Sequence, residues 1–376
     1  MAIAVRPTGN PAHALNDFMP LHGIDHVELW VGNAYQAAQF YRTLFGFDIV
    51  AFAGEETGVR DRASYVLRQG TITLVVTAGL GSESPIVQHV ALHGDGVHDI
   101  ALRVDDAEHA FREATRRGAG PALEPITLEG EHGVVRRSAI TTYGDTLHSF
   151  VERHEFRGAF LPGYRRTTGL HGDSCGLKAI DHVVGNVELG QMERWVAFYR
   201  DVMGFSQLVH FSDEQISTEF TALMSKVVQD GSTRVKFPIN EPAPGRGRSQ
   251  IQEYLDYNHG PGVQHIALLT GDIVETVRAM QARGVRFLRV PDTYYAHLRH
   301  RVGEIREDLH MIRELGILVD RDEHGYLLQT FTRPMEDRPT LFFEIIQRRG
   351  ARGFGVGNFK ALFEAIELEQ ARRGNL

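Results

Sequence analysis

Residues 23–47, GIDHVELWVGNAYQAAQFYRTLFGF, decide the fold because the chain repeats them. Residues 179–205, AIDHVVGNVELGQMERWVAFYRDVMGF, carry IDHV, FYR and GF in the same order. Each copy has the pattern of a short strand, a loop and a helix, and Gly46 or Gly204 follows the helix where a left-handed C-cap glycine is expected. The two halves of the chain therefore begin with the same unit.

A second pair of segments is also repeated. Residues 95–121, DGVHDIALRVDDAEHAFREATRRGAGP, match residues 261–287, PGVQHIALLTGDIVETVRAMQARGVRF. In each a strand ends near an acid, Asp105 or Asp272, that is predicted to cap the following helix, and the helix closes at Gly118 or Gly284. Each half thus contains two units of one strand, one helix and further strands, so four such units are expected along the chain.

The second half carries an insertion. Apolar residues recur at helical spacing over residues 294–315, where the first half has only a short loop near residues 124–132. Residues 317–332, ILVDRDEHGYLLQTFT, have the pattern of two strands joined at residues 322–325.

The length of 376 residues exceeds that of most single domains and favours two domains or one duplicated one. We expect a loose N-terminal arm over residues 1–20, a structural domain over 21–156 and a linker over 157–178. Residues 179–376 then form the catalytic domain, with a lid helix over 358–373.

Charge and cysteine content limit the class of protein. The net charge of −8 and the pI near 6.2 give no basic footprint for nucleic acid, and no basic block or long apolar run indicates a membrane partner. Cys175 is the single cysteine, so no disulfide can form within the chain and a cytoplasmic location is expected. A small-molecule substrate is the best default.

The copies differ where chemistry is expected. Matching TLHSF to TLFFE and aligning the other repeats pairs three positions across the halves: His26 with His182, Asp99 with His265, and Phe150 with Glu344. Only the C-terminal half therefore offers two histidines and a carboxylate, and the N-terminal trio is interpreted as structural.

Two neutral imidazoles and one carboxylate form a facial arrangement that suits iron(II) in enzymes that use oxygen. The three residues lie far apart in sequence, so they meet only if three strands of one curved sheet bring them together. Taken singly, Glu344 could be a solvated acid at a sheet edge, and each histidine a hydrogen-bonded core residue. Their matched strand positions favour the metal site.

Several segments resemble the 4-hydroxyphenylpyruvate dioxygenase family: FPINEPAPGRGRSQIQEYLDY, GPGVQHIAL, GYLLQTFTRPMEDRPTLFFEIIQRRG and GFGVGNFKALFEAIELEQARRGNL. The resemblance covers nearly the whole chain after the N-terminal arm. It implies an α+β vicinal-oxygen-chelate fold of the glyoxalase type, in which paired βαβββ modules form two open β-barrels. It further implies that iron(II) binds only in the C-terminal barrel.

The resemblance also assigns residues to roles. It implies the metal ligands His182, His265 and Glu344, and catalytic positions at Ser225, Asn240, Gln250 and Gln329. It implies substrate contacts at Gln264, Phe331, Phe342, Phe354, Phe359 and Asn358, the last at the start of the lid helix. Gln264 precedes His265 on a strand, so its participation requires a bulge or twist there.

The activity that the resemblance implies is conversion of 4-hydroxyphenylpyruvate and dioxygen to homogentisate and carbon dioxide, a step of tyrosine and phenylalanine catabolism. The alternative is 4-hydroxymandelate synthase, which shares ligands, substrate and fold but hydroxylates the benzylic carbon. Phe331 and Asn240 favour the dioxygenase, because the synthases are similar to it overall but carry aliphatic residues at such positions. A more remote alternative is a non-catalytic ligand-binding protein of the same fold. Relatives suggest a homodimer or homotetramer.

Overall fold

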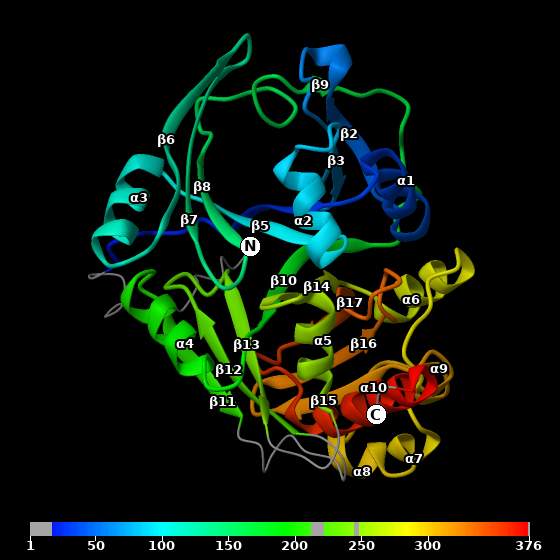
Figure 1. Cartoon of the computed structure of the whole chain (residues 1–376). Coiled ribbons are helices and arrows are strands. Elements are labelled where there is room, and N and C mark those ends of the chain that lie inside the picture. The colour runs from blue at the N-terminus through cyan, green and yellow to red at the C-terminus, as the bar shows by residue number, and fades with distance from the viewer. Residues whose placement is uncertain (1–16, 212–221, 244–247, 375–376) are drawn as a thin grey trace, which may run out of the picture.

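Two curved sheets, one from each half of the chain, make up the protein. The computed structural model describes residues 17–211, 222–243 and 248–374 (Figure 1). The first sheet has nine strands in the order β6-β7-β8-β5-β1-β4-β3-β2-β9, and the second has eight in the order β11-β12-β13-β10-β14-β17-β16-β15.

The N-terminal half contains, in chain order, β1 (Ile24–Trp30), α1 (Ala34–Phe45), β2 (Asp48–Ala53), β3 (Arg62–Gln69), β4 (Ile72–Gly79), α2 (Pro85–His93), β5 (Gly96–Arg103), α3 (Ala107–Arg116), β6 (Pro121–Gly130), β7 (Gly133–Thr141), β8 (Leu147–Glu152) and β9 (Arg165–Arg166).

The C-terminal half contains β10 (Leu177–Asn186), α4 (Met192–Asp201), β11 (Ser206–Phe211), β12 (Ala222–Gln229), β13 (Lys236–Ala243), α5 (Gln250–Asn258), β14 (Gly262–Thr270), α6 (Ile273–Ala282), α7 (Asp292–Tyr295), α8 (Leu298–Val302), α9 (Leu309–Glu314), β15 (Leu318–Asp322), β16 (Gly325–Phe331), β17 (Phe342–Arg349) and α10 (Val356–Arg373).

The two halves have the same topology. β1 pairs in parallel with β4 and antiparallel with β5, and β10 pairs in the same two ways with β13 and β14. β5 pairs in parallel with β8, and β14 pairs in parallel with β17. The four predicted βαβββ modules and the α+β class with two curved sheets are therefore confirmed.

Caps explain where several helices begin and end. Asn33 and Asp272 accept backbone N–H groups at the starts of α1 and α6, as N-cap side chains do. Gly46 ends α1 with φ of 76°, and a Cβ there would collide with the backbone oxygen of Asp173. The prediction that Asp105 caps α3 is wrong by one residue: Asp106 is the cap, and Asp105 pairs with His22 at 2.8 Å.

The insertion differs from its prediction. The helical spacing over residues 294–315 corresponds to three short helices, α7, α8 and α9, because the chain turns at Gly303, whose φ is 69°. In the first half, residues 124–132 are not a short loop. They belong to β6 and its turn into β7, and β6 is mostly exposed, so its apolar pattern was too weak to indicate a strand.

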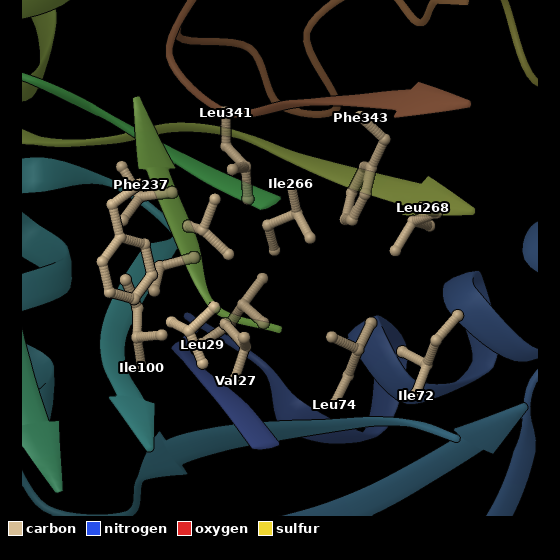
Figure 2. Close-up of a cluster of buried hydrophobic side chains, with 14 of the residues drawn as sticks. Val27, Leu29, Ile72, Leu74, Ile100, Phe237, Ile266, Leu268, Leu341 and Phe343 are labelled. Atoms are coloured by element: carbon tan, nitrogen blue, oxygen red, sulfur yellow. The ribbon is translucent and has the colours of Figure 1, made fainter. Parts of the chain in front are cut away.

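One hydrophobic core joins the two halves. Figure 2 shows Val27, Leu29 and Leu74 of the first sheet pointing across to residues of the second sheet, among them Ile266, Leu268 and Phe343. The Phe343 ring is fully buried and its centroid lies 5.0 Å from that of Phe45. Alternate residues of the same strands face the concave side of their own sheet, which leaves that side free to form a site.

The segment between the halves fills the first sheet. Phe156, Phe160 and Leu161 are buried in a separate cluster on the concave side of the N-terminal sheet, and β9 pairs with β2. Residues 157–164 of the expected linker thus plug the N-terminal barrel. Of the expected arm, residues 1–16 lie outside the described residues, whereas Met19 is buried in the shared core.

None of the helices within the described ranges has the length and apolar character needed to span a membrane.

Candidate active site

Three neighbouring strands bring His182, His265 and Glu344 together on the concave side of the second sheet. β14, which carries His265, lies between β10 with His182 and β17 with Glu344. The Nε2 atoms of His182 and His265 lie 3.2 Å and 3.4 Å from the same carboxylate oxygen, Oε2 of Glu344. All three side chains are buried. The three donor atoms therefore converge on one point, as ligands of a single ion would.

The equivalent place in the first half holds a different residue from the one predicted. His265 pairs with Phe342 in the β14–β17 ladder, and Asp99 pairs with Leu147 in the β5–β8 ladder. Counting two residues on from each partner places Ser149, not Phe150, opposite Glu344. A slip of one residue turns a side chain to the other face. Ser149 indeed faces Asp99, donating its backbone N–H at 2.9 Å.

Hydrogen bonds at Nδ1 orient both histidines. The Nδ1–H of His182 donates to Oδ1 of Asp181 at 2.8 Å, and that of His265 donates to Oε1 of Gln264 at 2.9 Å. Each Nε2 is then left to face Glu344, which is the usual orientation of a metal-binding imidazole. Two imidazole nitrogens and one carboxylate on one side, with the other side open to a cavity, fit iron(II).

The bulge that Gln264 requires is present. Gly185 pairs with Val263 and Val184 pairs with His265, so Gln264 is the extra residue in the β10–β14 ladder. The irregularity lets its amide reach the ring of the next residue on the same strand. Gln264 therefore contacts His265 directly.

Electrostatics keep the carboxylate ionised. Burial by itself raises the pKa of Glu344, but the charges and hydrogen bonds of His182 and His265 outweigh it and lower the pKa to about 2. Burial lowers the pKa of His182, while Glu344 and Asp181 raise it to a net value above normal. Burial leaves the pKa of His265 below normal.

Arg348 supports this arrangement from outside, and the sequence reasoning missed it. Its guanidinium donates two hydrogen bonds to Asp181, at 2.7 Å and 2.8 Å, and a third to the carbonyl of Gly353 at 2.6 Å. It also lies over the ring of Phe354, whose edge meets the ring of His182 with centroids 5.0 Å apart. One arginine thus links a histidine of the site to the segment that enters α10.

The N-terminal half repeats this support without the acid. His26 donates to Asp25 at 2.8 Å, Arg153 binds Asp25, and the ring of Phe160 lies 4.9 Å from that of His26. The signal that could have revealed the support is in the repeat itself, because both IDHV copies place an aspartate directly before the histidine. Phe160, from the plug, contacts His26 as Phe354 contacts His182.

A cavity of about 400 Å³ opens beside the three converging side chains. Besides them, its lining includes six residues that the sequence assigned to the substrate site: Ser225, Asn240, Gln329, Phe331, Phe354 and Phe359. It also includes four that the sequence did not single out: Val184, Val227, Pro238 and Leu362. These four are apolar, and no chemical signal distinguishes them from core residues before the fold is known.

The remaining assigned residues lie outside this cavity. Gln250, Gln264 and Phe342 line a second cavity of about 410 Å³. Phe342 also stacks on His265, with ring centroids 4.8 Å apart and planes at 22°. Asn358 is fully buried, and its Oδ1 accepts a hydrogen bond from the hydroxyl of Tyr294 at 2.6 Å, so it anchors the start of α10 instead of lining the cavity.

Comparison with known proteins identifies the family. Residues 15–161 match the model of the hydroxyphenylpyruvate dioxygenase N-terminal domain, and residues 179–330 match that of the glyoxalase, bleomycin resistance protein and dioxygenase superfamily. The chain is 47% identical to 4-hydroxyphenylpyruvate dioxygenase of Neurospora crassa, over 98% of this chain and 97% of that one. It is likewise 47% identical to that enzyme of Dictyostelium discoideum, over 95% and 100% of the two chains.

A solved structure agrees in fold. A triple mutant of 4-hydroxymandelate synthase from Streptomyces coelicolor superposes with a TM-score of 0.84 at 36% identity, over 94% of this chain and 100% of that one. One assignment agrees with all of these comparisons: the sequence identity over nearly the whole chain, the two family models and the common fold. The chain belongs to the 4-hydroxyphenylpyruvate dioxygenase family and is a metal-dependent dioxygenase of the glyoxalase superfamily.

Proposed function

We propose that this protein uses iron(II), held by His182, His265 and Glu344, to convert 4-hydroxyphenylpyruvate and dioxygen to homogentisate and carbon dioxide in tyrosine catabolism. The single observation that carries the proposal is the convergence of two Nε2 atoms on one carboxylate oxygen, at 3.2 Å and 3.4 Å, beside a cavity. Relatives named for this reaction share 44–47% of their residues with the chain, which supports the choice of substrate.

Bound iron(II) would supply the activation of dioxygen, with the keto acid providing electrons as it loses its carboxylate. The chain's own residues bind and orient the substrate. Ser225, Asn240 and Gln329 line the cavity with hydroxyl and amide groups, which can hold a phenol or a carboxylate without titrating near neutral pH. They also compete only weakly for the metal.

The aromatic side chains of the cavity exclude water. Phe331, Phe354 and Phe359 line the cavity, which suits a phenyl ring held beside the reacting centre. Gln264 and Phe342 contact His265 from its other sides and fix the orientation of its ring. Gln250 shares the second cavity with these two residues, and we propose that it acts through them.

The second candidate function is that of 4-hydroxymandelate synthase, which the similarity to the solved synthase structure supports. The resemblance of Asn240 and Phe331 to the dioxygenase pattern favours homogentisate. Chromatography of the product from 4-hydroxyphenylpyruvate separates the two, and hydroxymandelate as the main product would reverse the choice. Absence of oxygen uptake with the iron-loaded protein would instead favour a binding protein without catalysis.

The test of the metal site is the substitution Glu344→Gln. It should abolish oxygen uptake and weaken iron binding, because the ionised carboxylate that the two histidines face is lost. His26→Gln is the matched control, since His26 occupies the same place in the half that lacks the acid. Full iron content and activity in Glu344→Gln would overturn the assignment, as would equal losses in both variants.

We also propose a homodimer or homotetramer in the cytoplasm, on the strength of the family assignment. Size-exclusion chromatography with light scattering measures the oligomeric state, and a monomer at micromolar concentration would contradict it.

We also propose that the chain divides into a structural half, 21–156, and a catalytic half, 179–376. The support for it is that the described triad belongs entirely to the second half.

A further inference from the structure

A second group of metal-ligating side chains lies in the N-terminal half. Within the described ranges, two groups of three such side chains have all their donor atoms within 4.8 Å: the triad above, and His89, His93 and Asp145. His89 and His93 are four residues apart on α2, so both lie on one face of the helix. Asp145 follows β7 in the turn to β8. No residue is shared with the catalytic site.

We propose a second metal site, separate from the iron site, that binds zinc through His89, His93 and Asp145. Oδ2 of Asp145 lies 3.0 Å from Nε2 of His93 and 3.7 Å from Nδ1 of His89. Ligand atoms of a tetrahedral zinc ion, with bonds of about 2.0–2.1 Å, lie about 3.3 Å apart. The observed separations bracket this value.

The hydrogen bonding of His93 is the second observation. Its Nδ1 lies within hydrogen-bond distance of the backbone carbonyl oxygen of Asn258, which can only accept, so Nδ1 carries the hydrogen. In a neutral ring Nε2 then has a lone pair, and this lone pair faces the carboxylate of Asp145. Two acceptors at 3.0 Å repel unless a proton or a cation lies between them. The Nδ1 contact to a backbone carbonyl is also the usual support of a metal-binding imidazole.

The surroundings favour a metal ion that prefers nitrogen ligands. His89 and His93 are nearly buried, whereas the side chain of Asp145 is 61% exposed, which leaves one side open for water. Two imidazoles and one carboxylate suit zinc better than magnesium or calcium, which take oxygen ligands.

The site lies where the two halves meet. The carbonyl that supports His93 belongs to α5 of the C-terminal half, and Arg338 of that half donates to the carbonyl of Leu92 at 2.5 Å. The cavity next to the site, of about 340 Å³, is lined by residues of both halves. A bound ion would therefore fix α2, the β7–β8 turn and, through His93, the C-terminal end of α5 in the other half, and it should stabilise the folded chain.

The experiment is a metal titration of the full chain, stripped of metal, with zinc chloride at micromolar concentrations and neutral pH. Equilibrium dialysis followed by elemental analysis should give two zinc ions per chain for the wild type. The double substitution His89→Gln with Asp145→Asn should remove one, and affinity at that site should fall at least 100-fold. The double substitution His265→Gln with Glu344→Gln should remove the other and leave the N-terminal ion bound.

Two outcomes would overturn the proposal: one zinc ion per wild-type chain, or two in the His89→Gln, Asp145→Asn variant. The first would mean that a protonated His93 pairs with Asp145. Iron-dependent oxygen uptake at the wild-type rate in this variant shows that it is folded. Zinc should also raise the Tm of the His265→Gln, Glu344→Gln variant, which keeps only the N-terminal site. It should not raise the Tm of a variant that carries His89→Gln and Asp145→Asn as well. If zinc leaves the Tm of the first of these variants unchanged, the ion does not stabilise the fold.

Discussion

His182 and His26 occupy the same place in two copies of one module, and the residues opposite them decide what each can do. His182 faces Glu344 and an open cavity, whereas in the first half Ser149 occupies the position of Glu344. The aspartate behind each histidine is common to both: Asp181 is held by Arg348 and Asp25 by Arg153. The aspartate and arginine behind the histidine are therefore common to both halves, whereas Glu344 belongs only to the C-terminal site.

Replacing the supporting aspartate tests this division. Asp181→Asn should lower the iron affinity of the protein about 10–100-fold, because the neutral amide holds the ring of His182 less firmly and makes it less basic. Asp25→Asn is the matched control and should leave iron affinity unchanged. Isothermal titration of the metal-free proteins with iron(II) under anaerobic conditions measures both. A similar loss in the two variants would show that the aspartates serve only to hold the fold.

The lowered pKa of Glu344 predicts a dependence of stability on pH in the metal-free protein. Its pKa of about 2 in the fold lies below the usual 4.5, so the ionised carboxylate stabilises the folded state above about pH 4.5, and this contribution is lost as pH falls towards 2. The difference in free energy of unfolding between wild type and Glu344→Gln should therefore fall from about pH 5 to about pH 2. Urea unfolding at several pH values measures it, and a constant difference would refute the assignment of the shift.

At the scale of residues, the sequence predicted the three side chains that converge because the repeat allows each strand to be compared with its copy in the other half. It was wrong by one residue in the last strand of the comparison. Matching TLHSF to TLFFE aligned Phe150 with Glu344, whereas the pairing of the strands aligns Ser149 with Glu344. Gln250, predicted as catalytic, and Phe342, predicted to contact substrate, line a neighbouring cavity. The side of His265 on which a neighbouring side chain lies depends on the bulge at Gln264, and the sequence pattern does not show on which side that is.

At the scale of elements, α10 and the insertion act together. Figure 1 shows α10 near β15 and the short helices α7 and α8 at its side. Arg301 of α8 donates to the carbonyl of Gly357 at 2.5 Å, and the hydroxyl of Tyr294 of α7 contacts Asn358. The predicted lid helix is present, and its first turn is fixed by the part of the chain that has no counterpart in the N-terminal half.

The inner face of α10 should matter for catalysis more than its outer face. Phe359→Ala should lower kcat/KM for 4-hydroxyphenylpyruvate about tenfold or more, because the cavity loses an aromatic wall and admits water. Leu368→Ala, on the same helix but 48% exposed, should leave kcat/KM within about twofold. Steady-state oxygen uptake gives both values. Equal effects from the two substitutions would mean that the helix contributes through folding alone.

At the scale of the whole molecule, the halves are not independent units. The side chains that face away from the two concave surfaces meet in one core (Figure 2). In it, Phe343 of β17 packs against Phe45 and Tyr41 of α1. The repeat predicted four modules and the family resemblance implied two open barrels, and the structure has two curved sheets built from four such modules. The sequence did not predict the shared core, because the apolar residues of a strand do not show which partner they will face.

The shared core predicts that damage at the interface affects the full chain. Phe343→Ala should lower the free energy of unfolding by about 3–5 kcal/mol, since a fully buried ring between the halves is lost. Leu80→Ala, at a position 56% exposed, should change it by less than about 0.5 kcal/mol. Urea unfolding followed by circular dichroism should show one transition in each case. Two separate transitions, with only one shifted by Phe343→Ala, would contradict a common core.

The contact of a phenylalanine edge with the key histidine occurs in both halves, with centroids 4.9 Å apart in the first and 5.0 Å in the second. In the first half Ser149 stands at the position of Glu344, yet the ring of His26 is also held by an aspartate, itself bound by an arginine, and by a phenylalanine ring. The rotational freedom of such an imidazole is therefore lost when the chain folds, before any ion arrives. His182 is preorganised in the same way, so metal binding there carries a smaller entropy penalty than it would on a mobile side chain.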